Sequence, residues 1–177
     1  MSRQNILFSQ RCSEESMGQG YPALEIALGT LPLLGVLLIH GVGMYIVQRQ
    51  FERHGVPIYR SGRAGQLFFG AMVVLIVTTH LIEMLVWAAT LFGLGSIATF
   101  RDAFYYAAST YTALGYGEGT LPHEWRLLAP MLAISGLFAF GWTTGILVNL
   151  VSQAQDERRA GLAERAGRRP PAGPDSA

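Results

Sequence analysis

The hydrophobic positions of the chain gather in three long stretches, at about 23–47, 67–95 and 127–151. A helix needs about 20 apolar residues to cross a hydrocarbon core of roughly 30 Å, and each stretch is long enough. The pattern therefore predicts an all-α membrane protein with three transmembrane helices. The composition agrees, because half of the 177 residues are hydrophobic and 14% are charged, against about 25% in globular domains.

Three polar segments flank these stretches. Residues 1–22 are polar and of mixed charge, so they lack the early apolar core of a signal peptide and predict an external N-terminal segment. Residues 48–66 contain Gly55 and Pro57 among charges, which indicates a short cytoplasmic linker. Residues 152–177 are charged first and proline-rich last, and this composition predicts a mostly disordered tail.

The arginines predict the orientation in the membrane. Nine of them fall in the linker after the first stretch or in the tail, and four fall on the other side. The larger group is Arg49, Arg53, Arg60, Arg63, Arg158, Arg159, Arg165, Arg168 and Arg169, and the smaller is Arg3, Arg11, Arg101 and Arg126. Because cytoplasmic flanks carry the excess of positive charge, we expect the N-terminus outside the cell membrane and the C-terminus in the cytoplasm.

The segment between the second and third stretches carries the functional signal. Residues 101–112 are rich in aromatic side chains and are too few to cross a bilayer, so they predict a short re-entrant helix. Two closely spaced glycines, Gly115 and Gly117, follow this helix. Asp102 lies near its start, where a negative charge complements the positive end of the helix dipole.

Residues 110–118 read Thr-Tyr-Thr-Ala-Leu-Gly-Tyr-Gly-Glu. This run resembles the potassium-channel signature, in which Thr-Val-Gly-Tyr-Gly is usually followed by Asp. The resemblance extends over about 67–151 and includes His80, Glu83, Trp87 and the run 121–126. In this fuller pattern the chain is similar to small bacterial channels of the two-transmembrane pore superfamily. It implies an outer helix at 67–95, a pore helix at 101–112, a filter at 113–117 and an inner helix at 127–151, with 23–47 as one extra N-terminal helix.

The resemblance also implies residue roles. The carbonyls of four filter residues would replace the hydration shell of the ion, and three neighbours would support the filter. The ion-binding residues would be Ala113, Leu114, Gly115 and Tyr116, with Thr112, Gly117 and Glu118 in support. Since the chain has one copy of the motif and the ring needs four, the resemblance implies a homotetramer in the lipid bilayer. We expect no cofactor and no metal other than potassium as the permeant ion.

Two departures from the family pattern affect selectivity. Ala113 stands where a threonine usually adds hydroxyl oxygens, and Glu118 replaces the usual aspartate. Passive potassium conduction is the predicted function. The alternatives are a weakly selective cation channel and a non-conducting membrane scaffold that retains the pore architecture.

Ionisable residues within the spans form a second group of candidates. His80 and Glu83 are three residues apart on one helix face, and we favour a structural contact with each other or with the pore helix over a functional site. A haem between His40 and His80 is disfavoured, because His40 would lie about 10 Å and His80 about 20 Å from the inner ends of their spans.

Glycines in the third stretch allow two interpretations. Gly136, Gly141 and Gly145 either permit close helix packing or, at Gly141, provide a gating hinge. Regularly spaced arginines for voltage sensing are missing from the first two spans. The sequence also shows no enzymatic constellation, no metal-ligand spacing, no nucleic-acid-binding face and no sign of a soluble partner, and its single cysteine, Cys12, excludes an internal disulfide.

Overall fold

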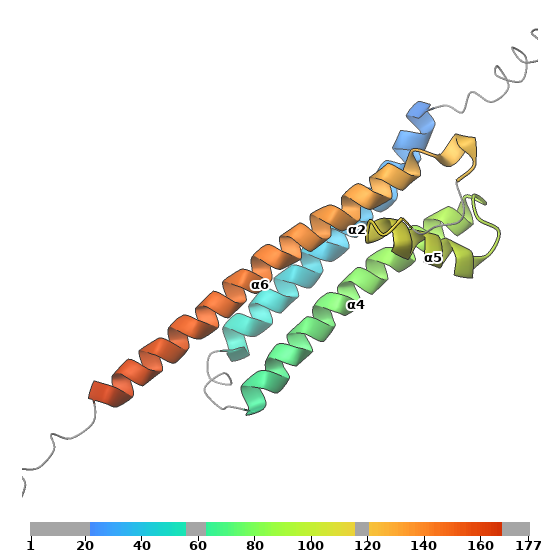
Figure 1. Cartoon of the computed structure of the whole chain (residues 1–177). Helices are drawn as coiled ribbons and strands as arrows, with labels where there is room; N and C mark the ends of the chain where they lie inside the picture. The colour runs from blue at the N-terminus through green and yellow to red at the C-terminus, as the bar shows by residue number, and fades with distance from the viewer. Residues whose placement is uncertain (1–21, 56–62, 116–120, 168–177) are drawn as a thin grey trace, which may run out of the picture. The chain divides into compact units, whose positions relative to one another are not determined.

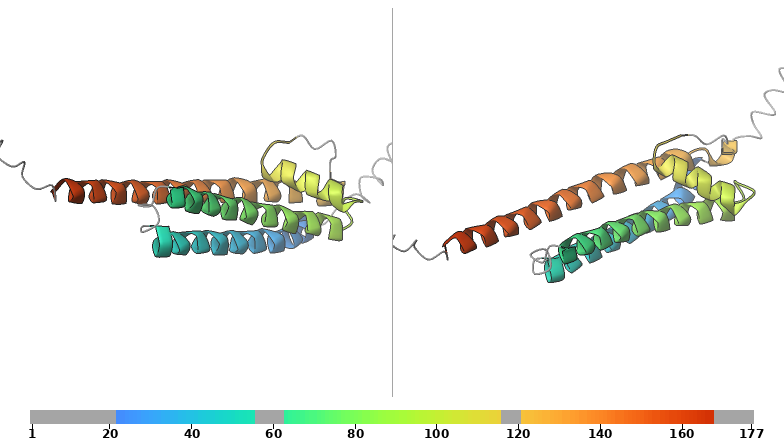
Figure 2. Two further views of the ribbon diagram at one scale, coloured as in Figure 1. Left: turned by 90° about the horizontal axis from the view of Figure 1, so that it is seen from below. Right: turned by 60° about the horizontal axis from the view of Figure 1, so that its bottom comes forward.

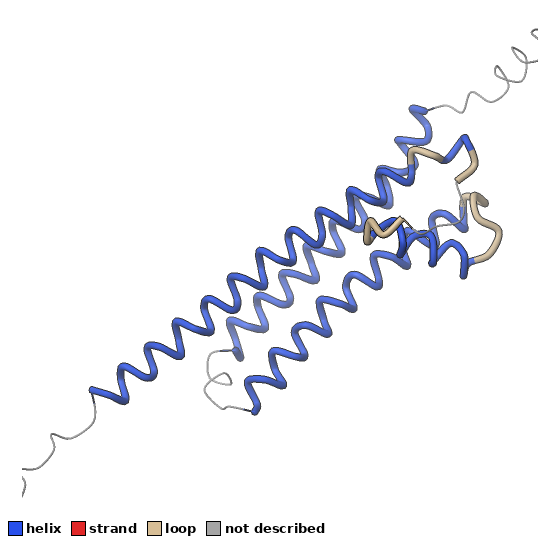
Figure 3. Tube along the Cα trace, viewed as in Figure 1, coloured by secondary structure: helices blue, strands red, loops and turns tan. Residues whose placement is uncertain are grey.

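The computed structural model describes residues 22–55, 63–115 and 121–167 (Figure 1). Its elements, in chain order, are α2 (Pro22–Gln50), the π-helical turn η1 (Phe51–Gly55), α4 (Arg63–Gly93), α5 (Phe100–Tyr111), the 3-10 turn η2 (His123–Trp125) and α6 (Leu128–Gly167). Within these ranges the chain contains helices and loops and no strand (Figure 3).

Three of the helical segments are long and apolar enough to cross a membrane: Ala23–His54, Arg63–Gly93 and His123–Ala163. The predicted all-α membrane fold with three spanning helices is therefore confirmed. The fourth helix, α5, has 12 residues and is too short to span a bilayer.

The described chain divides into two compact units. The first combines the part of α2 up to Gly41 with Thr79–Phe140, and the second combines Val42–Thr78 with the part of α6 that begins at Gly141. The first unit contains α5 and all of the candidate site that the structure describes.

The core of the first unit brings α5 against its neighbours in α2, α4 and α6 (Figure 2). Its largest fully buried apolar side chains are Trp87 and Leu91 from α4, Tyr111 from α5, and Leu128 and Leu132 from α6. Alanines on the inner face of α5, Ala103 and Ala107, allow the short helix to lie close to this core.

Helices α2 and α6 also meet closely in the first unit. A Cβ added at Gly29 would lie 2.7 Å from Leu128 Cδ2 and 2.7 Å from Met131 Sδ. One helical turn earlier, the buried Glu25 carboxylate accepts a hydrogen bond from the Leu127 backbone N–H at the start of α6. The glutamate thus joins the N-terminal ends of α2 and α6.

The second unit has its own apolar core. Met44, Val47 and Phe51 pack with residues of α4 and α6, and the rings of Phe51 and Phe68 have centroids 6.4 Å apart. Thr143 Oγ1 donates to Met44 Sδ at 3.8 Å.

Helix α6 is longer than the sequence analysis expected. It runs to Gly167, so residues 152–167, predicted to be mostly disordered, are helical and this prediction was wrong. Alanine, glutamine, glutamate and arginine in this segment are good helix formers, and they continue a helix that is already nucleated. The prolines begin only at Pro170.

Candidate functional site

Helix α5 begins at a well-formed N-cap. Thr99 has extended backbone angles, φ −122° and ψ 145°. Its Oγ1 accepts a hydrogen bond from the Asp102 backbone N–H at 3.1 Å and lies 2.6 Å from Asp102 Oδ2. Asp102 therefore lies at the positive end of the helix dipole, where a negative charge is stabilising.

The end of α5 is a tight reversal at the first predicted filter residue. The Ala113 N–H donates to the Thr110 carbonyl at 3.0 Å, and the Leu114 N–H donates to the Ser109 carbonyl at 2.9 Å. Ala113 has φ +57°. These bonds and this angle form a Schellman motif, in which the residue after the cap takes the left-handed conformation.

Helix α4 ends in the same motif with a different residue. There the Gly95 N–H donates to the Phe92 carbonyl at 3.0 Å and the Ser96 N–H donates to the Leu91 carbonyl at 3.2 Å, with Gly95 at φ +68°. Glycine takes this angle without steric cost. Among the non-glycine residues that the structure describes, Ala113 is the one with a positive φ. Its Cβ costs roughly 1–2 kcal/mol in this conformation.

The structure describes the first half of the predicted filter. Leu114 is 62% exposed within the chain, and Gly115 has φ +71°, with its N–H 3.3 Å from the Ser109 carbonyl. Tyr116 and Gly117 of the predicted filter, and the predicted supporting residue Glu118, lie outside the described residues.

Thr112 is the C-cap residue of α5, and its hydroxyl forms a hydrogen bond within the same helix. Its Oγ1 donates to the Ala108 carbonyl at 2.8 Å. The hydroxyl therefore bonds to the helix that precedes the filter residues.

Gly136 of α6 holds the end of α5 from one side. A Cβ at Gly136 would lie 2.0 Å from the Tyr111 carbonyl oxygen and 2.8 Å from its carbonyl carbon, so only glycine fits. A Cβ at Gly141 or Gly145 would meet nothing within 4 Å. Of the three glycines, Gly136 therefore makes the close contact within the chain, and the hinge at Gly141 stays a prediction.

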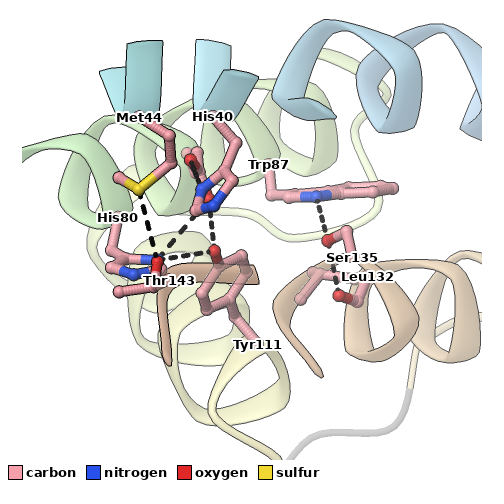
Figure 4. A network of polar contacts seen from close by, with 9 residues as sticks. His40, Met44, His80, Trp87, Tyr111, Leu132, Ser135 and Thr143 are labelled. Atoms are coloured by element: carbon pink, nitrogen blue, oxygen red, sulfur yellow. Dashed lines mark hydrogen bonds and ion pairs between the residues drawn. The ribbon is translucent and has the colours of Figure 1, made fainter. Parts of the chain in front are cut away.

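Next to Gly136, a buried hydrogen-bonded chain joins α4 to α6. Trp87 Nε1 donates to Ser135 Oγ at 3.0 Å, and Ser135 Oγ donates to the Leu132 carbonyl at 2.7 Å (Figure 4). Trp87 and Ser135 are both fully buried. This chain fixes α6 at the turn that contacts Tyr111.

The Tyr111 side chain belongs to a cluster of four buried polar residues (Figure 4). We call this group the polar cluster, and its members are His40, His80, Glu83 and Tyr111. The Tyr111 hydroxyl donates to Glu83 Oε2. His40 Nδ1 lies 2.9 Å from Glu83 Oε1, and His80 Nδ1 lies 3.0 Å from the Tyr111 hydroxyl and 3.7 Å from Glu83 Oε2. Glu83 thus contacts α5 as well as both histidines.

The protonation of the Tyr111 hydroxyl decides which atoms of the polar cluster donate hydrogen bonds and which accept them. Burial raises the pKa of its hydroxyl above the ordinary value of 10, and the hydrogen bond to Glu83 raises it further. The phenol therefore stays protonated and donates to Glu83. In this hydrogen-bonded arrangement the Tyr111 oxygen is left to accept from His80, which requires the tautomer of that ring with its proton on Nδ1.

Phe140 of α6 makes aromatic contacts with two residues of the polar cluster. The Phe140 ring stacks on His80 with centroids 4.7 Å apart and meets Tyr111 edge-on at 5.6 Å. The rings of His40 and His80 have centroids 5.4 Å apart. Tyr111 thus contacts residues of both α4 and α6.

The proximity of the two histidines corrects the depth argument made from the sequence. That argument placed them about 10 Å apart in depth, and this was wrong. Helical structure continues past the predicted span ends: His40 lies 15 residues before the end of η1 at Gly55, and His80 lies 17 residues after the start of α4 at Arg63. At about 1.5 Å per residue these depths are nearly equal.

Sequence reasoning missed two residues that the structure brings into contact here. Tyr111 and Glu25 were not singled out as contacts, although a charged residue within an apolar stretch is a signal that applies to Glu25. Gly136 was named as one of three glycines that permit close helix packing, but its contact with Tyr111 was not. Nothing in the spacing of His40 and Glu83, which are 43 residues apart, indicates that they meet.

The segment that runs from α4 to α6 and contains this site is similar to a known protein family. Residues 75–153 match an ion-channel family model. The match begins in α4, contains α5, the filter residues and Gly136, and ends in α6. It supports an ion channel of the two-transmembrane superfamily and gives no indication of enzymatic chemistry. No match was found among curated proteins or among solved structures.

Proposed function

We propose that this chain is one subunit of a homotetrameric membrane channel that conducts potassium passively through a filter of backbone carbonyls. The ion-binding carbonyls are those of Ala113, Leu114, Gly115 and Tyr116. The observation that carries the proposal is the strained reversal at Ala113, which lies between two membrane-length helices and within the region that matches the ion-channel family.

The backbone at this reversal suits ion coordination. Ala113 and Gly115 both have positive φ, at +57° and +71°, on either side of Leu114. Strained non-glycine conformations persist where the surrounding structure imposes them and cluster at functional sites. We infer that such a backbone turns carbonyl oxygens toward a cation in the assembled channel, where they replace its hydration shell.

Helix α5 adds an electrostatic contribution. Its C-terminal end lies at Thr112, directly before the filter residues. A helix C-terminus carries partial negative charge, so four such ends in a tetramer favour a cation near the filter.

The tetramer follows from the single copy of the motif in each chain. Leu114, 62% exposed in the chain, would be covered by neighbouring subunits in this arrangement. The arginine distribution supports an orientation with the proposed filter on the outer side and the C-terminal end of α6 in the cytoplasm.

Ion flux into liposomes that contain the purified protein tests the proposal. We expect potassium flux above that of protein-free liposomes, and a smaller flux when sodium replaces potassium. Equal fluxes of the two ions would favour the weakly selective channel, for which the missing threonine hydroxyl at Ala113 is the argument. Absence of flux across conditions would favour the non-conducting scaffold and contradict the proposal.

A further inference from the structure

The polar cluster contains more ligand chemistry than a helix contact requires. His40, Glu83 and Tyr111 are fully buried and His80 is 7% exposed. One ligand atom each from His40, His80 and Glu83 lies within 4.8 Å of the others. Two helices supply these three side chains, and α5 supplies Tyr111 beside them (Figure 4).

We propose that His40, His80 and Glu83 bind one divalent transition-metal ion of the zinc type. Two imidazoles and one carboxylate form a donor set that zinc uses in proteins. Imidazole nitrogen also suits copper, iron and nickel, whereas magnesium and calcium prefer oxygen ligands. The Tyr111 hydroxyl or a water is the candidate for the fourth position.

The distances fit such an ion. Zinc binds nitrogen and oxygen at about 2.0–2.2 Å, so neighbouring ligands of a tetrahedral site lie about 3.3–3.5 Å apart. The Nδ1 atom of His40 is 2.9 Å from Glu83 Oε1, and that of His80 is 3.7 Å from Glu83 Oε2. These two values lie on either side of the expected separation, so small side-chain movements suffice.

Charge favours an ion as well. An ionised carboxylate buried between membrane-length helices is costly unless a cation supplies the compensating charge. A divalent ion supplies it and is bound by the neutral rings once their protons lie on Nε2. The competing arrangement is the hydrogen-bonded cluster without an ion, in which both rings carry the proton on Nδ1.

The ion would tie the extra N-terminal helix to the filter. His40 comes from α2, and Tyr111 precedes Ala113 by two residues. An ion at this point therefore fixes the end of α5 from which the filter starts. This consequence for conduction rests on the proposed channel function, whereas binding of the ion does not.

Metal content of the purified full-length protein tests the site. After incubation with Zn²⁺ and removal of free metal, we expect one zinc per chain, and Co²⁺ in its place should give the visible absorption of a tetrahedral nitrogen and oxygen site. His40→Ala, His80→Ala and Glu83→Gln should each lower the affinity at least about 100-fold. Exposed His54 and His123 provide matched controls, and His54→Ala and His123→Ala should bind as the wild type does.

Helical circular dichroism and elution volume identify variants that fail to fold, and His40→Gln replaces His40→Ala in that case. The proposal is overturned if the wild type retains no zinc, or if the two control variants lose as much zinc as the cluster variants. Potassium flux is measured in parallel. Zinc binding without potassium flux would contradict the channel and leave the metal site standing. Potassium flux without zinc binding would contradict the metal site and leave the channel standing.

Discussion

Ala113 carries the backbone strain of the reversal at the end of α5, where the proposed filter starts. At the end of α4 the same Schellman motif uses Gly95, and at the end of α5 it uses an alanine with φ +57°. The Cβ of Ala113 costs roughly 1–2 kcal/mol in this conformation. A β-branched side chain at positive φ is a genuine outlier and costs more.

Substitutions at Ala113 should therefore follow backbone strain. Ala113→Gly should raise the free energy of unfolding by up to about 1 kcal/mol, because the gain is partly offset by the greater freedom of glycine in the unfolded chain. Ala113→Thr should lower both stability and potassium flux, although threonine is the residue usual in the family. Denaturation in detergent and liposome flux measure these effects. An Ala113→Thr variant with unchanged stability and higher potassium selectivity would contradict this account of the turn.

The sequence predicted where the candidate filter lies but not what surrounds it. Aromatic residues followed by close glycines are local signals, and they indicated the segment that contains Ala113 and Gly115. The polar cluster depends on helix packing that joins His40 to Glu83 across 43 residues. Such a contact has no local sequence signature, and an error in the span ends was enough to separate the histidines in the depth argument.

At the scale of helices, α6 holds α5 through Gly136. The absent side chain allows the Tyr111 carbonyl to approach, and the neighbouring Ser135 is fixed by Trp87 of α4. The C-terminal end of α5, from which the proposed filter starts, is thus positioned by contacts between helices.

Gly136→Ala should displace the end of α5. Its Cβ would lie 2.0 Å from a backbone oxygen, and overpacking of this kind typically costs about 1–3 kcal/mol. We expect lower thermal stability and a loss of flux. Gly141→Ala is the matched control on the same helix, since its Cβ meets nothing within 4 Å, and it should be stable. Equal stability of the two variants would argue against the contact.

Glu25 holds the start of α6. Its buried carboxylate accepts the Leu127 N–H, where the positive end of the helix dipole favours a negative charge by up to about 2 kcal/mol. Glu25→Ala should lower the free energy of unfolding by about that amount. The exposed Glu124 supplies the control, and Glu124→Ala should change stability by less than about 0.5 kcal/mol. Denaturant unfolding in detergent checks both, and a neutral Glu25→Ala would show that the contact is unimportant.

Helix identity was easier to predict than helix ends. Long apolar stretches predicted α2, α4 and α6, and the short aromatic segment predicted α5. The ends depend on caps and on continued propensity, so α6 extends past the predicted end at residue 151 to Gly167. The charged composition of residues 152–167 predicted disorder. These residues are good helix formers and follow a helix that is already nucleated, so the helix continues through them.

For the whole molecule, composition and arginine distribution supported a membrane protein, and three membrane-length helices agree. The two described units each have an apolar core. A tetramer adds contacts that a single chain does not contain, so the arrangement of four filters stays a proposal.

The most direct test of the filter compares potassium efflux from liposomes that contain the wild type, Gly115→Ala or Gly95→Ala. Gly115 and Gly95 have nearly equal φ, +71° and +68°, and a Cβ at either position meets nothing within 4 Å. The local strain of the two substitutions is therefore matched, and only Gly115 lies in the proposed filter. We predict that Gly95→Ala conducts as the wild type does and that Gly115→Ala lowers the flux at least about tenfold. Equal flux from the two variants would contradict ion conduction along this backbone.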